Sequence, residues 1–241
     1  YITRAGLPTA EALVSELEDI HRRLQHETVL KLVDTGSANG FLFVAEEYVE
    51  GESLRRVEDS YAGARQSFSL QEASQIAVSI LEGLAAMHAA GVAGGLVNPF
   101  NVWVQEKRLP QNKVTRRIYL SGVGLWRLLA RFIWDEGLPW DYNSSRYVAP
   151  EYQGSGGGGT PAMDVYAVGV IFYELLTRQT PMGTYLSPSQ IRDDLPACVD
   201  DIVDLALAAN AEDRYPSPTD MINDIQRAFT EEDRPQRRWS F

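Results

Sequence analysis

The stretch that decides the fold reads YVAPEYQGSGGGGTPAMDVYAVG and spans residues 147–169. Its centre, Gly154 to Gly159, is as glycine-rich as a phosphate-binding loop, but the Gly-Lys-Ser/Thr that completes such a loop does not follow. A flexible surface insertion is therefore the preferred interpretation of this run. Directly after it, Val165 to Leu176 is apolar on nearly every face, which predicts a helix that is buried on all sides.

The rest of the pattern predicts a small mixed lobe on a larger helical lobe. Ser69 and Glu72 form a capping box at the start of a long helix, and Gly91 suits the position after its end. Ser217 and Pro218 open the last helix as a capping serine and a proline at the first helical position. The expected strands are 1–4, 28–33, 41–46, 102–105 and 117–120, with a turn at 36–40, and the other expected helices are 9–25, 198–209 and 217–229.

Composition narrows the class of protein. With 241 residues and 44% hydrophobic content, the chain can bury one large core or two small lobes that share a cleft. A net charge of −11 argues against a nucleic-acid-binding protein, which needs a basic surface. No apolar run approaches the roughly 20 residues of a membrane span, and Cys198 is the only cysteine, so we expect no internal disulfide and a reducing setting. The basic end of the chain, Arg234 to Phe241, is either a solvated tail or a juxtamembrane or partner-docking segment.

Several motifs occur in an order that resembles the eukaryotic-type Ser/Thr protein kinase superfamily, and the first of them is similar to bacterial receptor-type kinases. They are YVEGESL at 48–54 (the hinge and the start of the next helix), MHAAGV at 87–92 (the end of the long helix), YVAPE at 147–151 (the APE motif), DVYAVG at 164–169 (the start of the buried central helix), and Arg214, where the family's arginine pairs with the APE glutamate. The resemblance implies an α+β, protein-kinase-like bilobal fold with a small, incomplete β-rich N-lobe and a larger helical C-lobe. The implied boundaries are 1–50 for the partial N-lobe, 51–230 for the C-lobe and 231–241 for the basic tail.

The resemblance also gives three residues a structural role. A bidentate pair of Glu151 and Arg214 would hold the loop to the helical lobe. Asp164 would accept hydrogen bonds from the backbone of the catalytic loop. Such residues stabilise the fold, and their presence says nothing about activity.

The catalytic loop lacks the family's chemistry. Phosphoryl transfer in this family uses a Lys on the phosphates, a carboxylate at the substrate hydroxyl, and an Asp and an Asn on Mg²⁺. In the aligned loop the His-Arg-Asp triplet becomes Gly94, Gly95 and Leu96, and a leucine cannot accept a proton. Asn98 replaces the Lys that neutralises the transferred phosphate, and only Asn101 matches its metal-ligand position.

The other phosphate and metal positions are altered as well. Gly122 stands at the Asp of the DFG motif, which leaves one amide ligand and no carboxylate for Mg²⁺. If the chain begins with the third strand, Arg4 stands at the phosphate-binding Lys, with Glu16 and Glu18 both candidates for its helix partner. The glycine-rich loop would precede the first residue. We therefore expect no bound metal and no cofactor.

The positions that sandwich adenine in the family hold Ile2 and Trp103, both larger than the usual residues. The preferred hypothesis is that these side chains fill the adenine slot themselves; alternatively, Trp103 turns outward onto the lobe surface. Glu46 stands at the gatekeeper position, where it would pair with Arg4 or face solvent.

The segment that corresponds to the activation segment carries several aromatic residues, among them Trp134, Trp140 and Tyr142. They either pack into the vacated cleft or form an exposed patch that docks a partner, since aromatic residues contribute strongly to interface energetics.

The expectation is a pseudokinase, that is, a regulatory or scaffolding domain without phosphotransferase activity. Its partner would be an active kinase, the substrate of that kinase or a phosphopeptide-binding domain. A divergent but active nucleotide-dependent transferase is the second hypothesis, and a kinase-derived sensor of another small molecule is the third. The expected setting is the cytoplasm, alone or as the cytoplasmic domain of a membrane-anchored protein, with no nucleic-acid partner and with membrane contact only through sequence outside this chain.

Overall fold

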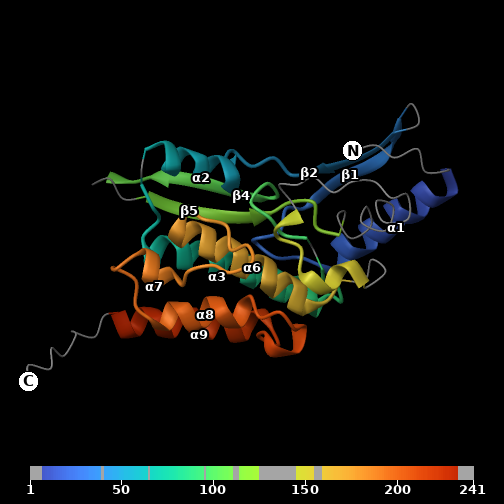
Figure 1. Cartoon of the computed structure of the whole chain (residues 1–241). Coiled ribbons are helices and arrows are strands. Elements are labelled where there is room, and N and C mark those ends of the chain that lie inside the picture. The colour runs from blue at the N-terminus through green and yellow to red at the C-terminus, as the bar shows by residue number, and fades with distance from the viewer. Residues whose placement is uncertain are drawn as a thin grey trace, which may run out of the picture.

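A computed structural model describes residues 7–38, 41–64, 66–94, 96–110, 114–124, 145–154 and 159–232. Figure 1 shows α1 with the strands β1 and β2 at one end, the strands β4 and β5 beneath α2, and the remaining long helices stacked below them. The elements are α1 Leu7–Arg23, β1 Leu32–Ala38, β2 Phe41–Glu46, β3 Glu52–Ser53, α2 Leu54–Gly63, α3 Leu70–Ala89, β4 Val102–Arg108, β5 Val114–Leu120, η2 Pro150–Gly154, α6 Pro161–Thr177, α7 Pro188–Ile191, α8 Cys198–Ala206, η3 Ala211–Asp213 and α9 Pro218–Glu232.

Two small antiparallel sheets carry the strands. β1 pairs with β2, and the sheet β3-β4-β5 is ordered as the chain runs. The strand predicted at 28–33 was right only for its last two residues, which belong to β1, because Val29 makes only an isolated bridge to Leu120 at the end of β5. β1 begins at Leu32 and continues through Gly36, where a turn was expected, since each of its residues from Asp34 to Ala38 has a partner on β2; the register shifts at Val33.

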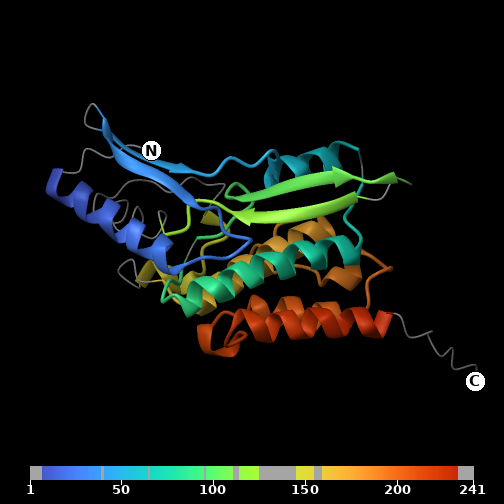
Figure 2. The ribbon, with the colours of Figure 1, turned by 180° about the vertical axis from the view of Figure 1, so that it is seen from behind.

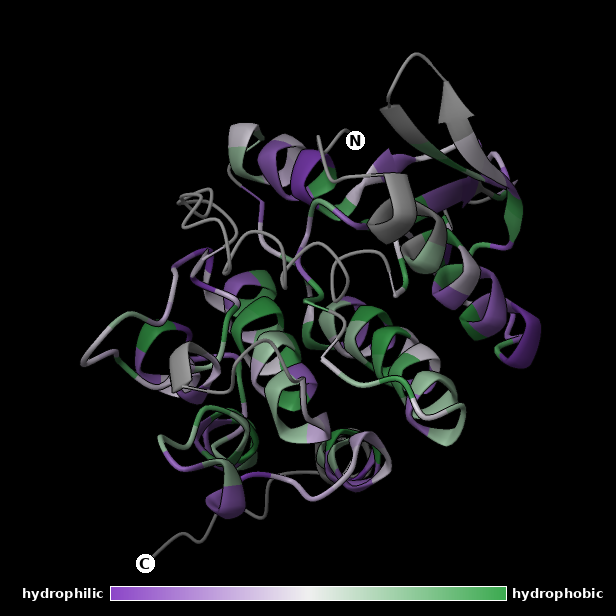
Figure 3. Cartoon of the chain, turned by 90° about the vertical axis from the view of Figure 1, so that its right-hand side faces the viewer, coloured by the Kyte–Doolittle hydropathy of each residue, from purple (hydrophilic) through white to green (hydrophobic). Residues whose placement is uncertain are grey.

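The core is built around α6. All residues from Met163 to Thr177 are buried except Tyr166, as the unbroken apolar run predicted. α3 packs against both α6 and α9, and Figure 2 shows α3 lying between β5 and α9. In Figure 3 hydrophobic residues gather on the inner helices of the larger lobe, while hydrophilic residues lie mainly on the outer elements.

Helix ends follow their local signals. Ser69 and Glu72 form the expected capping box of α3, and Gly91 follows its C-cap with a φ of +79° that glycine adopts at little cost. The amide N–H of Asp220 donates to the hydroxyl of Ser217 at the start of α9. The short helix α7 was not predicted. Within the described ranges no helix is both long and apolar enough to cross a membrane.

Candidate functional site

The first turn of α6 holds the loop that precedes Leu96. Asp164, which is 1% exposed, accepts hydrogen bonds from the Gly94 amide at 2.8 Å and from Nε2 of His88 at 2.7 Å. The contact with His88 therefore requires a proton on that ring nitrogen. Asp164 thus binds the backbone of this loop, as its position in the motif predicted.

Gly94 crosses the backbone of Gly159 at very short range. A Cβ on Gly94, whose φ is +70°, would lie 2.2 Å from the Cα atom of Gly159, and a Cβ on Gly159 would lie 2.3 Å from the Cα atom of Gly94. Any side chain at either position, a histidine included, therefore requires the backbone to move. The sequence predicted Gly94 as an altered position but gave Gly159 only as part of a glycine run.

Leu96 has a left-handed backbone, with a φ of +49°. For a residue with a Cβ, this conformation costs about 1–2 kcal/mol relative to the right-handed one. Its carbonyl oxygen accepts hydrogen bonds from Nδ2 of Asn98 at 3.0 Å and Nδ2 of Asn101 at 3.3 Å. No carboxylate side chain stands at this place in the described loop.

The two asparagines of the loop are buried and bind its backbone. Oδ1 of Asn101 accepts the Asn98 amide at 2.9 Å, and Oδ1 of Asn98 accepts the Phe100 amide at 2.9 Å. Asn98 and Asn101 are 6% and 7% exposed. Both side chains therefore stabilise the loop itself, whether or not either also meets a ligand.

Gly122 binds a carboxylate from a segment that is remote in the sequence. Its amide donates to Oε1 of Glu46, at the end of β2, over 2.7 Å. Burial raises the pKa of Glu46, and this effect exceeds the lowering caused by the hydrogen bond from Gly122. The alternative that Glu46 simply faces solvent was wrong, because its carboxylate joins β2 to the Gly122 loop. Arg4, the partner expected under the other alternative, lies outside the described residues.

α1 reaches the same loop through a second contact. Nε2 of His21 lies 3.1 Å from the carbonyl oxygen of Val123. Burial lowers the pKa of His21 more than this hydrogen bond raises it, so the neutral imidazole is favoured. Glu18, one of the two helix candidates, accepts the hydroxyl of Thr35 on β1. Nothing in the sequence around His21 or Glu46 marked either as a contact to this loop.

Trp103 lies on the outer face of β4. Its neighbours Val102 and Val104 are buried in the core, so strand alternation directs the indole to the opposite face, where it pairs in register with Tyr119 of β5 and Ser53 of β3. The side chain is half-buried there. Its proposed contact with Ile2 falls outside the described residues, so the filling of the adenine slot stays a prediction.

Glu151 and Arg214 form the expected bidentate ion pair. Nη1 and Nη2 of Arg214 donate to the two carboxylate oxygens of Glu151 at 2.7 and 2.8 Å. The guanidinium, whose side chain is 0% exposed, also donates to the carbonyl oxygens of Ala162 and Ala208. Burial alone would raise the pKa of Glu151, but the hydrogen bonds from Arg214 and a backbone amide lower it overall. The pair therefore joins η2 to α6 and to the segment after α8.

Some predicted site residues lie outside the described ranges. They are Ile2, Arg4, Gly95, Trp134, Trp140 and Tyr142, and the same holds for the tail from residue 233 onward. Among the described residues, no group of three or more His, Cys, Asp or Glu side chains is placed to hold a metal ion.

Comparison with known proteins identifies the family of this chain. The sequence matches the family described as "Protein kinase domain" over residues 5–239. It is 29% identical to the serine/threonine-protein kinase PknL of Mycobacterium tuberculosis over 225 residues, which are 87% of this chain and 52% of that protein. It is 28% identical to the probable serine/threonine-protein kinase pknA2 of Bifidobacterium longum over 162 residues, which are 65% of this chain and 19% of that protein. The chain thus spans from about a fifth to about half the length of these relatives.

Solved structures show the same fold. The crystal structure of the Mycobacterium tuberculosis PknI kinase domain superposes with a TM-score of 0.70 at 23% identity, covering 93% of this chain and 81% of that chain. The bilobal kinase-like architecture predicted from the motifs is therefore confirmed.

Proposed function

Because the chain belongs to the protein kinase family, we propose that it is a member without phosphotransferase activity and acts as a regulatory or scaffolding protein-binding domain. The observation that carries the proposal is Leu96, which stands where the family places its catalytic carboxylate. A kinase needs that carboxylate to orient the substrate hydroxyl and accept its proton. An alkyl side chain does neither.

The metal and phosphate positions support the same conclusion. Gly122 offers no carboxylate at the DFG position, and Oδ1 of Asn101 already accepts the amide of Asn98. In kinases Mg²⁺ is held by the DFG Asp, the catalytic-loop Asn and phosphate oxygens. The described residues of this site therefore do not fit an ATP–Mg²⁺ complex in the family's usual arrangement.

The partner proposed is a protein. An active kinase, its substrate or a phosphopeptide-binding domain would suit a domain that keeps the kinase fold without its chemistry. A net charge of −11 disfavours nucleic acid, and membrane contact would come only from sequence outside this chain. We place the domain in the cytoplasm by analogy with receptor-type kinases.

A second candidate rests on Glu46. Its carboxylate binds the amide of Gly122, so an acid from β2 stands next to the place of the missing aspartate. A divergent transferase with a displaced metal ligand would use such a group, because Mg²⁺ sites are often built from one or two carboxylates and substrate phosphates. This candidate requires that the protein bind ATP with Mg²⁺ and that Glu46 contribute to the binding.

Thermal unfolding with and without ATP and Mg²⁺ tests both candidates. A ligand at 100 times its dissociation constant stabilises a protein by about 2.7 kcal/mol, which raises the unfolding temperature by several degrees. We expect no shift at millimolar ATP–Mg²⁺ and no transfer of γ-phosphate to a generic protein substrate. A Mg²⁺-dependent shift that disappears in Glu46→Gln, together with phosphate transfer, would overturn the proposal in favour of the second candidate.

A further inference from the structure

The sheet β3-β4-β5 has an open edge along β5. At the end of this strand, Leu120 donates its amide to the carbonyl oxygen of Thr28 at 2.7 Å and accepts the amide of Leu30 at 3.0 Å, so its backbone groups point away from β4. Because this direction alternates along an antiparallel strand, the backbone groups of Ile118 and Arg116 point the same way. Within the described part of the chain, the amide and carbonyl groups of these two residues bind no other backbone group. An unpaired strand edge of this kind is a template for another strand.

A groove with a volume of about 810 Å³ lies between this edge and α3. Ile118 and Arg116 line one side of it, and side chains of α3 between Gln71 and Glu82 line the other. Ser74 also lines the groove; its side chain is 1% exposed, and its hydroxyl has no hydrogen-bond partner among the described residues. The groove therefore offers unpaired polar groups to an occupant with an extended backbone.

The groove carries an excess of negative charge. The guanidinium of Arg116 lies 2.9 Å from the carboxylate of Glu72 and 2.7 Å from that of Glu106, so its charge is already matched. Glu82 adds a third carboxylate, which is exposed on α3. Three acids and one guanidinium favour a basic occupant over an acidic one.

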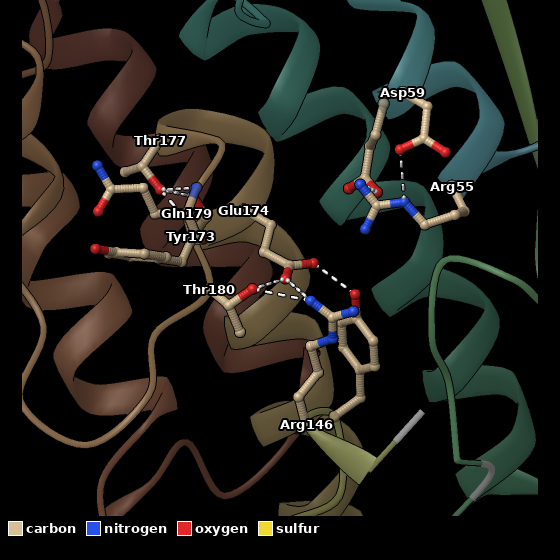
Figure 4. Close-up of polar contacts among 10 residues, drawn as sticks. Arg55, Asp59, Arg146, Tyr173, Glu174, Thr177, Gln179 and Thr180 are labelled. Carbon is tan, nitrogen blue, oxygen red and sulfur yellow. Dashed lines mark hydrogen bonds and ion pairs between the residues drawn. The ribbon is translucent and has the colours of Figure 1, made fainter. Parts of the chain in front are cut away.

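A buried acid at the end of α6 is already occupied by the chain itself. Glu174 accepts the hydroxyl of Tyr147 at 2.6 Å and the hydroxyl of Thr180 at 2.7 Å, and Nη1 of Arg146 lies 3.5 Å from the same carboxylate. Figure 4 shows Glu174 with Arg146 and Thr180. Since both carboxylate oxygens have partners, one of them an arginine, a basic segment is expected at the β5 groove rather than at Glu174.

The segment that follows α9 has the composition that the groove requires. Residues 233–241, which lie outside the described ranges, read DRPQRRWSF and contain three arginines. Trp239 and Phe241 alternate with Arg238 and Ser240. This period of two is typical of a strand with one apolar face, and tryptophan and phenylalanine favour strands.

The end of α9 also brings this segment close to the groove. α9 packs against α3, and Gln226, near the end of α9, lines the groove. Figure 2 shows the end of α9, the start of α3 and the start of β5 at the same end of the molecule. Nine extended residues span about 30 Å, whereas the five residues from Val114 to Ile118 span about 17 Å. The segment is therefore long enough to reach β5 and to follow it.

We propose that residues 236–241 bind this groove as an added strand along the open edge of β5, with Trp239 and Phe241 directed toward α3. The segment enters at the start of β5 and so runs parallel to it, as Val29 does in its bridge to Leu120. The bound segment covers an edge that otherwise pairs with strands of other chains, and its release exposes a docking site. This inference goes beyond the proposed function, and it holds whether or not the chain transfers phosphate.

Amide hydrogen exchange tests the proposal, because β5 contains its own control. The Ile118 and Arg116 amides point to the open edge, whereas the Arg117 amide points to β4. In a chain that ends at Glu232, we expect the protection of the Ile118 and Arg116 amides to fall by about tenfold, the value of one hydrogen bond, while that of Arg117 stays constant. Equal protection of Ile118 in both chains, or an equal fall at Arg117, would overturn the proposal.

A full-length variant separates the added strand from a general effect of the deletion. Trp239→Ser combined with Phe241→Ser should lower the protection of Ile118 as the deletion does, whereas Ser240→Ala, on the opposite face of the added strand, should not. Equal effects of the double variant and Ser240→Ala would contradict the inference. Protection of Ile118 that survives the deletion and rises with protein concentration would identify a second copy of the chain as the occupant, and would also overturn it.

Discussion

Gly94 and Gly159 cross with so little space that a Cβ on Gly94 would lie 2.2 Å from the Cα atom of Gly159. The crossing joins the catalytic loop to the start of α6, where Asp164 binds the Gly94 amide. The position of Gly94 is therefore restrained both by the backbone of Gly159 and by the hydrogen bond to Asp164. A chain with histidine at this position, as the family usually has, requires another path for one of the two segments.

Gly94→Ala should destabilise the protein well beyond the cost of its left-handed backbone alone. Strain at a positive φ costs about 1–2 kcal/mol, and the clash adds to it, so we expect a loss of about 3 kcal/mol or more. Gly91→Ala is the matched control, because Gly91 has a φ of +79° but no atom within 4 Å of an added Cβ. Chemical denaturation of both variants gives the comparison. Equal losses would show that the crossing contributes nothing.

Arg214→Ala should cost about 3 kcal/mol, because it leaves Glu151 and several carbonyl oxygens without their donor. The exposed pair of Arg22 and Asp19 is the control, with side chains that are 72% and 55% exposed. Arg22→Ala should change the free energy of unfolding by no more than about 0.5 kcal/mol. Denaturant midpoints measure both. A loss at Arg214 as small as that at Arg22 would contradict the structural role of the pair.

Glu46→Gln should be neutral or stabilising at pH 7 to 8. The amide oxygen still accepts the Gly122 amide, and the charge whose burial raises the pKa of Glu46 is removed. A raised pKa in the folded state means that stability is lost as pH rises above about 4.5, so the variant should gain stability relative to the unchanged protein in that direction. Glu46→Ala deletes the hydrogen bond and should lose about 1–2 kcal/mol. Unfolding temperatures at pH 5 and 8 check both, and a destabilised Glu46→Gln at pH 8 would refute the reasoning.

His21 should make stability depend on pH in the opposite direction from Glu46. Burial lowers its pKa, so the unfolded chain binds a proton first as the solution is acidified. The stability from neutral His21 should be lost as pH falls below about 6.5. His21→Gln, which keeps a donor for the Val123 carbonyl, should flatten the acid limb of the stability profile. His26→Gln is the control, since His26 is half-buried beside Thr28; an equal effect at both sites would rule out His21 as the cause.

Local sequence patterns predicted much of the fold, and the resemblance to kinase motifs predicted part of the site. The apolar run of α6 and the capping box at Ser69 depend on neighbours a few positions away, so one segment of sequence contains the whole signal. Asp164 and the Glu151–Arg214 pair were found because the family motif names them. The other contacts join residues far apart in the chain. Nothing near Glu46 indicates Gly122, 76 positions away, as its donor.

The burial of Glu58 could not be predicted from its neighbours in sequence either. On α2 it follows two arginines and precedes an aspartate, which is typical of a solvated helix face. In the folded chain its side chain is nevertheless only 7% exposed. The start of β1 was predicted wrongly for a related reason: the backbone next to Val29 forms hydrogen bonds with Leu120 of β5, which is distant in sequence. There a partner that is remote in sequence overrides the local pattern.

The Gly94–Gly159 crossing also bears on how such a domain can change over evolutionary time. A mutation that introduces histidine at position 94 places its side chain against the backbone of Gly159, so the protein first acquires a folding defect. A side chain at position 94 would require the chain around Gly159 to move in an earlier, separate step. The structure thus imposes an order on any such change, because the backbone excludes a side chain at position 94 until Gly159 has moved.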